Sequence, residues 1–228
     1  MDNRLIIPPW GIADILVGLF GVLSGTILIK VFLLNNTLIP DNPDALTITI
    51  AIFISETMLI LVVIGLTLFK YKCSWIFLGL TRTLHISHYW LALAVLGGSF
   101  FSNGLYFFIV STADWETLIP TGIPAIIVGK GVYRIFNSFI LGIWGPFAEE
   151  IFFRGFILSG LTTRFGVTFA LITSSLIFSL SHITLSIIVP VFISGILLGF
   201  LYIKTRSIWP CIAVHSIQNL IALTFFGS

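Results

Sequence analysis

The sequence predicts an all-α membrane protein, a polytopic bundle of about seven transmembrane helices, with about six or about eight as the alternatives. Three observations support this fold class. Of the 228 residues, 57% are hydrophobic and only 9% are charged, and the mean hydropathy is +1.13. Such a chain is too apolar for a water-soluble domain, and its apolar runs are too long for a disordered one. We therefore expect one integrated membrane domain with no soluble partner domain.

Apolar runs that approach the length of a membrane span recur along the whole chain. A span takes about 20 largely apolar residues, and the fifth run is the shortest of the set. We describe residues 1–134 as amino-terminal transmembrane helices with interfacial segments, and residues 135–228 as a carboxyl-terminal helical core. The predicted spans are residues 12–34, 46–69, 89–111, 135–161, 167–183, 185–203 and 208–226.

The amino-terminal runs are typical of closely packed helices. Glycines recur along residues 12–34 and give that run a face of small residues, which favours close helix packing in a membrane. The second run carries Glu56 near its middle, which we interpret as a packing residue rather than a proton or ligand group. Residues 70–88 mix charged and aromatic side chains, a pattern typical of a segment at the lipid headgroups.

The fourth run contains two adjacent glutamates within apolar sequence. An ionised carboxylate in hydrocarbon costs at least about 2.5 kcal/mol, so each group needs a partner, a proton or water. On a helix, Glu150 and Arg154 lie at positions i and i+4 and can pair, whereas Glu149 is turned about 100° away. Glu149 is therefore the group left free for chemistry. Pro146 lacks a backbone donor and predicts a kink one turn earlier, which leaves the carbonyl of Gly142 open.

Two histidines lie within the later apolar runs, His182 in the fifth and His215 in the seventh. A desolvated glutamate beside histidines could act as a general base on water. Asn219 lies one turn from His215 on the same helix face, and the two could donate hydrogen bonds to an oxyanion. Alternatively Glu149, His182 and His215 could hold zinc with one open water position. Both versions are left open by the residues alone.

The charge distribution excludes one class of partner and predicts an orientation. The net charge is +2 and basic residues form no large cluster, so we expect no nucleic-acid partner. Most lysines and arginines fall in loops on one side, which predicts a multi-pass protein of the cell membrane with a cytoplasmic amino terminus. Cys73 and Cys211 lack the spacing of a metal or redox motif and are expected to be free thiols. The positive loops contain Arg4, Lys70, Lys72, Arg82, Arg164, Lys204 and Arg206.

Three ordered motifs on successive apolar helices resemble the signature of the CPBP family. That family comprises intramembrane CAAX-type prenyl proteases together with bacteriocin-processing and immunity proteins, also called the Abi family. The resemblance spans roughly residues 135–225, whereas residues 1–134 are similar only as generic spans. The motifs are Glu149-Glu150-x-x-x-Arg154, Phe178-x-x-x-His182 and His215-x-x-x-Asn219.

The resemblance implies a proteolytic site within the bilayer, acting on a hydrophobic peptide or membrane-protein substrate. Glu149 would be the general base that activates water, and His182 would orient that water. Members are often labelled metalloproteases, and a metal-independent glutamate mechanism is also proposed for the fold; we favour the latter, with zinc as the alternative cofactor. The supporting residues would be Glu150 with Arg154 for structure and electrostatics, and His215 with Asn219 for the oxyanion.

Two other classes of function compete with an endopeptidase. The chain departs from the prenyl-protease branch in having about seven spans where structurally known relatives have eight, so substrates other than prenylated CAAX sequences are also expected. In one of these two classes, a non-proteolytic immunity or scaffold protein, the same polar cluster would do no more than specify helix packing. A transporter or proton pathway could use Glu56, Glu149 and the histidines, but the sequence contains no convincing internal repeat.

Overall fold

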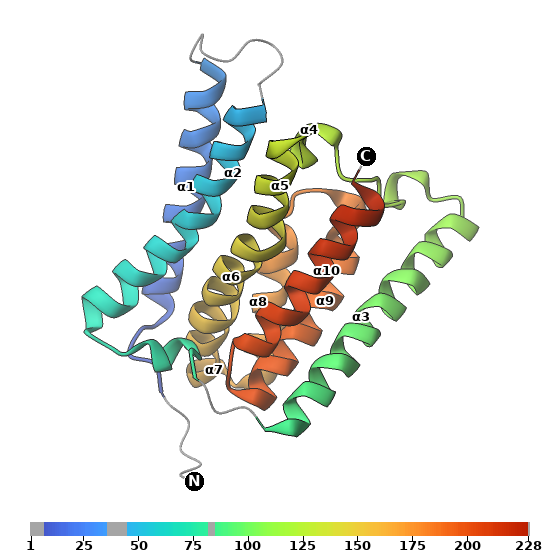
Figure 1. Cartoon of the computed structure of the whole chain (residues 1–228). Coiled ribbons are helices and arrows are strands. Elements are labelled where there is room, and N and C mark those ends of the chain that lie inside the picture. The colour runs from blue at the N-terminus through green and yellow to red at the C-terminus, as the bar shows by residue number, and fades with distance from the viewer. Residues whose placement is uncertain (1–6, 36–44, 82–84, 228) are drawn as a thin grey trace.

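The computed structural model describes residues 7–35, 45–81 and 85–227. Within these ranges every regular element is a helix, and an isolated parallel bridge joins Ile123 to Gly227. Figure 1 shows long helices lying side by side, with the shorter ones at their ends. The predicted all-α polytopic helix bundle is confirmed. Two of the positively charged residues used for orientation, Arg4 and Arg82, lie outside the described ranges.

All seven apolar runs predicted from the sequence form helices, with shifts of a few residues at their ends. The elements are α1 (Ile12–Asn35), α2 (Ala45–Val63), η1 (Ile64–Phe69), η2 (Trp75–Leu78), α3 (Ile86–Thr112), η3 (Glu116–Leu118), α4 (Ala125–Val128), α5 (Val132–Phe139), η4 (Ile140–Trp144), α6 (Gly145–Glu150), η5 (Ile151–Leu158), α7 (Ser159–Phe165), α8 (Val167–Leu180), α9 (Leu185–Thr205) and α10 (Trp209–Phe226).

Five helices in the described part of the chain are long and apolar enough to cross a membrane: α1, α2 with η1, α3, α9 and α10. The fifth predicted span, α8, has 14 residues and is shorter than these. Large apolar side chains cover the outside of the bundle, and Phe20 and Phe101 are 72% and 74% exposed. So much exposed hydrocarbon is unfavourable in water and matches a lipid-facing surface. The protein is an integral membrane protein.

The fourth predicted span lies within one uninterrupted helical run, Val132–Phe165, built from α5, η4, α6, η5 and α7. The backbone keeps right-handed helical dihedrals at each junction, including Gly145 and Ile151. The η4 and η5 segments are π-helical, so their hydrogen bonds span five residues instead of four. The disturbance expected at Pro146 therefore takes the form of a π-helical turn just before it. We call this run the central helix.

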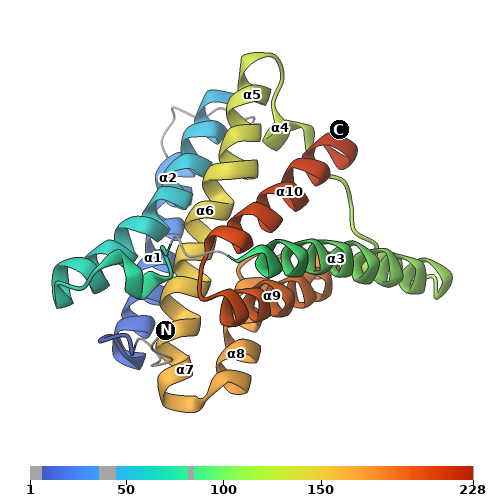
Figure 2. The ribbon, with the colours of Figure 1, turned by 60° about the horizontal axis from the view of Figure 1, so that its bottom comes forward.

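The central helix lies between two groups of helices. Figures 1 and 2 both place α1 and α2 on one side of it and α8, α9 and α10 on the other, with α3 outermost. Every residue of η5 is buried, and Phe152 and Phe156 are among the largest side chains in the core. Helices from residues 1–134 pack against the carboxyl-terminal core, α2 on α6 and α3 on α9 and α10. The central helix thus carries Glu149 and Glu150 into the middle of the bundle.

Candidate active site

Glu150 and Arg154 form the predicted ion pair inside the core. The Glu150 side chain is fully buried, and Arg154 Nη1 donates to Glu150 Oε1 at 2.8 Å. Arg154 Nη2 also donates to the carbonyl of Gly195 on α9 at 3.4 Å, and its guanidinium lies 4.4 Å from the centre of the Phe178 ring. These contacts compensate the loss of hydration of both charges. They also tie the central helix to α8 and α9.

His215 on α10 lies between the two glutamates. Its Nδ1 is 2.9 Å from Glu150 Oε1, the same oxygen that accepts from Arg154, and its Nε2 is 3.5 Å from Glu149 Oε2. Because Glu150 pairs with Arg154 as a carboxylate, its oxygen accepts and His215 Nδ1 donates. The other ring nitrogen, Nε2, therefore faces Glu149. The sequence predicted that Glu150 supports the site, but it did not predict that Glu150 anchors His215.

His182 follows the end of α8 and is half-buried. Its Nδ1 is 3.0 Å from the carbonyl of Phe178, which can only accept, so Nδ1 donates and Nε2 carries the free lone pair. The Phe178 ring contacts both histidines edge to face, with ring centres 5.0 Å from His182 and 5.8 Å from His215. The rings of the two histidines thus pack against the same phenyl ring, that of Phe178. Among the described residues, Glu149 makes a polar contact with His215 and none with His182.

Asn219 contacts the backbone of the central helix rather than His215. Its Nδ2 donates to the carbonyl of Leu141 at 2.9 Å. In the π-helical turn the N–H of Gly145 donates to the carbonyl of Ile140, five residues earlier. The next hydrogen bond of the same kind would run from the N–H of residue 146 to the carbonyl of Leu141. Residue 146 is proline and has no N–H, and Asn219 supplies the missing donor. Because the hydrogen bonds span five residues here, the carbonyl that Asn219 binds is that of Leu141, one residue before the Gly142 carbonyl that the sequence predicted to be open.

Three carboxyl groups around the site keep a buried oxygen that has no hydrogen-bond partner among the described residues, the Oε2 atoms of Glu56, Glu149 and Glu150. The Glu149 side chain is 18% exposed and is the more accessible member of the pair of adjacent glutamates. Such atoms are rare in proteins and usually mark a place for water, an ion or a reacting group. The unpartnered oxygen of Glu149 is Oε2, which also lies 3.5 Å from His215 Nε2, so a water molecule bound to this oxygen would lie beside that histidine.

Only two of the three predicted zinc ligands, Glu149 and His215, make a polar contact with each other in the described structure. Among the described residues, no three or more His, Cys, Asp or Glu side chains form a group that could hold a metal ion. The side chains of Glu149, His182 and His215 thus do not fit a zinc site with three protein ligands.

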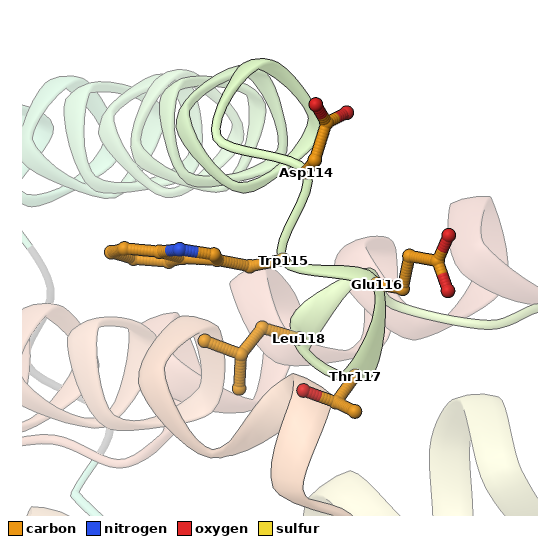
Figure 3. Close-up of a pocket in the computed structure, with 5 residues that line it drawn as sticks. All are labelled: Asp114, Trp115, Glu116, Thr117 and Leu118. Atoms are coloured by element: carbon orange, nitrogen blue, oxygen red, sulfur yellow. The ribbon is translucent and has the colours of Figure 1, made fainter.

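An open pocket lies at the end of α3, well separated in sequence from the residues above. It is lined by one continuous segment, and Figure 3 shows the Trp115 ring lying over Leu118 while Asp114 and Glu116 point outward. None of the predicted site residues lines this pocket. We assign it no part in the chemistry.

The fold and the buried cluster define a polytopic membrane protein with a carboxylate and histidine site between its helices. Residues 131–221 match the family model of the type II CAAX prenyl endopeptidase Rce1-like proteins, and this segment contains all three motifs. The chain is 35% identical over 80 residues to "Putative membrane peptidase YdiL" of Bacillus subtilis (strain 168). That match covers 35% of this chain and 33% of the relative, so it spans about a third of the relative's length. No solved structure matches the chain. The resemblance to the CPBP family of CAAX-type proteases is confirmed over the matched segment.

Proposed function

We propose that this protein is an intramembrane endopeptidase that hydrolyses a peptide bond of a hydrophobic, membrane-associated or prenylated substrate. One observation carries the proposal: the buried Oε2 of Glu149 accepts no hydrogen bond from the described residues, and this same oxygen lies 3.5 Å from His215 Nε2. The similarity of residues 131–221 to CAAX prenyl endopeptidases supports this reaction class. The carboxylate is positioned to receive a proton from water inside the bundle.

In the proposed reaction Glu149 is the general base. It takes a proton from water while the water oxygen forms a bond to the carbonyl carbon of the substrate, and the carbonyl π electrons move to its oxygen. When the C–N bond breaks, Glu149 returns that proton to the departing amine nitrogen. The carboxylate is then regenerated, so one water molecule is consumed and the protein is unchanged.

The neighbouring residues keep their predicted roles as parts of the proposal. His182, with Nδ1 held by Phe178, has Nε2 left to orient the attacking water. Asn219 uses one hydrogen of its amide nitrogen for Leu141 and carries a second that could reach an oxyanion. His215 is anchored by Glu150 through Nδ1 and presents Nε2 toward Glu149; to donate to the oxyanion, Nε2 must carry a proton as well. Glu150 and Arg154 hold this arrangement in place.

The test is cleavage by the purified full chain in lipid vesicles. The probes are a fluorophore–quencher peptide that ends in a farnesylated Cys-aliphatic-aliphatic-X sequence and the same peptide without the lipid. Glu149→Gln keeps the shape of the side chain but removes the base, so we expect kcat to fall by about 10²–10⁴-fold. Glu116→Gln is the matched control, because it makes the same change at an exposed carboxylate on η3. Unchanged cleavage by Glu149→Gln would contradict the proposal.

The two probes also separate substrate classes. Cleavage of the farnesylated peptide alone supports a prenylated substrate, and cleavage of both supports recognition of the apolar peptide itself. If neither is cut, the membrane peptides of cells that produce the wild type and the Glu149→Gln variant are compared by mass spectrometry of their termini. Identical termini in the two samples would favour the second candidate, a non-proteolytic immunity or scaffold protein.

That second candidate has one observation in its favour. The Glu150, Arg154 and His215 network links the central helix to α9 and α10 and would stabilise the bundle whether or not a reaction occurs. It predicts that Glu149→Gln keeps full biological function as long as the protein folds. Glu149 Oε2 lies 3.5 Å from His215 Nε2 but makes no hydrogen bond among the described residues, so it adds little to such a network, and for this reason we favour the endopeptidase.

A further inference from the structure

Helix α2 lies along the central helix in a register fixed by hydrogen bonds. Thr49 Oγ1 donates to Asn137 Oδ1 at 2.7 Å, and Trp144 Nε1 donates to Thr57 Oγ1 at 3.1 Å. Residue numbers rise together on the two helices, so they run in the same direction, and Figure 2 shows them side by side. This register places Glu56, the residue before Thr57, at the level of residue 143, within one turn of Gly145.

The carboxyl group of Glu56 lies against the central helix at Gly145, which has no side chain. A Cβ atom placed on Gly145 would be 3.5 Å from Glu56 Cδ. Gly145 and Glu149 are at positions i and i+4 and share one face of the helix. The glycine thus gives Glu56 room to reach the face that carries Glu149.

No lysine or arginine is paired with Glu56 or Glu149 among the described residues, and the polar side chain next to Glu149 is His215, whose Nε2 is 3.5 Å from Glu149 Oε2. Each of these two glutamates keeps one buried oxygen that accepts no hydrogen bond from the described residues. Arg154, a nearby cation, is already bound to Glu150, and Asp14 on α1 is paired with Lys70. Two ionised carboxylates at close range in apolar surroundings repel each other strongly, whereas one proton shared between them removes the repulsion and supplies a hydrogen bond.

We propose that Glu56 is a positioning residue of this site, whose protonated carboxyl group donates a hydrogen bond to the Glu149 carboxylate and fixes its orientation. The inference rests on the proposed function of Glu149 as a general base. Glu56 keeps its proton throughout the reaction. Glu149 alone accepts the proton of the attacking water and returns it to the leaving amine, so the pair carries one negative charge before and after each turnover.

Infrared spectroscopy of the full chain in lipid vesicles tests the proton without any substrate. A protonated carboxyl group gives a C=O stretching band that is separate from the bands of carboxylates. We expect Glu56→Gln to lack one such band that the wild type has. We also expect Glu149→Gln to keep that band at a shifted frequency, because the acceptor of the Glu56 hydrogen bond has changed.

Thr57→Val is the matched control for this measurement. It removes the hydrogen bond from Trp144 at the same contact between α2 and the central helix, but it alters no carboxyl group. The band should therefore be unchanged in this variant. An identical band in wild type and Glu56→Gln would overturn the proposal. A band that is lost in Glu56→Gln but does not shift in Glu149→Gln would also overturn it, because Glu56 would then be hydrogen-bonded elsewhere.

Cleavage kinetics test the positioning role separately. Misplacement of a catalytic group by about 1 Å can cost about 10²-fold, so we expect Glu56→Leu to lower kcat by about that factor with little change in KM. Glu56→Gln should recover at least about tenfold of this loss, because an amide can donate the hydrogen bond that leucine cannot. Equal activity of Glu56→Leu and the wild type would show that the residue only packs.

The outcomes distinguish this inference from the proposed function. If Glu149→Gln cleaves as fast as the wild type, the general-base assignment fails, while the infrared result on the shared proton is unaffected. If Glu149→Gln is inactive and the Glu56 variants cleave normally, only the positioning role fails. Folding of each variant is checked by its elution from a gel-filtration column and its thermal unfolding in detergent.

Discussion

At the scale of single residues, Glu150 is the centre of the polar cluster. One of its oxygens accepts from both Arg154 and His215, and the side chain has no exposed surface. Charges this deeply buried are stable only while their partners are present. The sequence predicted the pair with Arg154 from the i, i+4 spacing. The contact with His215 joins residues on different helices, and its position follows from how those helices pack.

Removal of Arg154 therefore gives a direct test of this cluster. Arg154→Met leaves the Glu150 carboxylate buried without its cation, and we expect the free energy of unfolding to fall by about 3–5 kcal/mol. The double variant Glu150→Leu with Arg154→Met replaces both charges with apolar groups and should recover part of this loss. Recovery is incomplete because the buried His215 Nδ1 then lacks its acceptor. The measurement is equilibrium unfolding in mixed detergent micelles.

Lys204→Met is the control for the single change, because Lys204 is exposed and forms no part of this cluster. Peptide cleavage by the same variants shows whether activity is lost independently of stability. We expect the double variant to fold but to remain inactive, because His215 has lost its anchor. A double variant that is no more stable than Arg154→Met would contradict the view that the unpaired charge of Glu150 causes the loss of stability.

At the scale of elements, the central helix explains why part of the site was predictable and part was not. The apolar run and the proline predicted a helix disturbed near residue 146, and this was correct. Whether its hydrogen bonds span four or five residues depends on packing against other helices, so the π-helical turn and the open carbonyl of Leu141 were not predicted. Glu56 was interpreted as a packing residue. The residue that lies beside it depends on how α2 is aligned with the central helix, and the sequence does not show that alignment.

The link between Asn219 and the central helix can be tested by combining a substitution of Asn219 with one of Pro146. Asn219→Leu leaves the carbonyl of Leu141 without a donor, and we expect a loss of about 1–3 kcal/mol in unfolding free energy. Pro146→Ala restores an N–H at the position that a π-helical bond to Leu141 requires. The double variant should therefore be more stable than Asn219→Leu alone, as measured by thermal unfolding in detergent.

Pro146→Ala by itself serves as the reference for this cycle. In that variant Asn219 still donates to Leu141, so the added N–H has little left to satisfy and the gain should be small. If Pro146→Ala raises stability equally in the presence and absence of Asn219, the two residues are uncoupled. The proposed explanation for the asparagine would then be wrong.

At the scale of the whole molecule, the amino-terminal segment is attached to the central helix. Trp10 Nε1 donates to the carbonyl of Phe156 at 2.9 Å, and Asp14 accepts from the N–H of Gly11. Asp14 also binds Lys70 at the end of the second span, and this hydrogen bond raises the pKa of Lys70. These contacts gather the start of α1 and the end of α2 at one end of the bundle. The positive charges there are those that predict the cytoplasmic face.

The two cysteines make this orientation measurable in intact cells. Cys73 follows the second span beside Lys70 and is half-buried, whereas Cys211 is fully buried. We therefore expect a membrane-impermeant maleimide to label Cys73 in inverted membrane vesicles and not in intact cells. Burial raises the pKa of the Cys73 thiol above its ordinary value, and the thiolate is the reactive form, so labelling should accelerate as the pH rises.

A cysteine on the other side of α3 completes the experiment. Thr117 on η3 is exposed and is separated from Cys73 by one predicted span, so the Thr117→Cys variant should be labelled in intact cells through its new thiol. Cys211 should stay unlabelled in both preparations until the protein is unfolded, because its side chain is enclosed by the core. If Cys73 were labelled from outside the cell and the new thiol of the Thr117→Cys variant only from inside, the orientation would be reversed. The loop charges would then not determine how this bundle inserts.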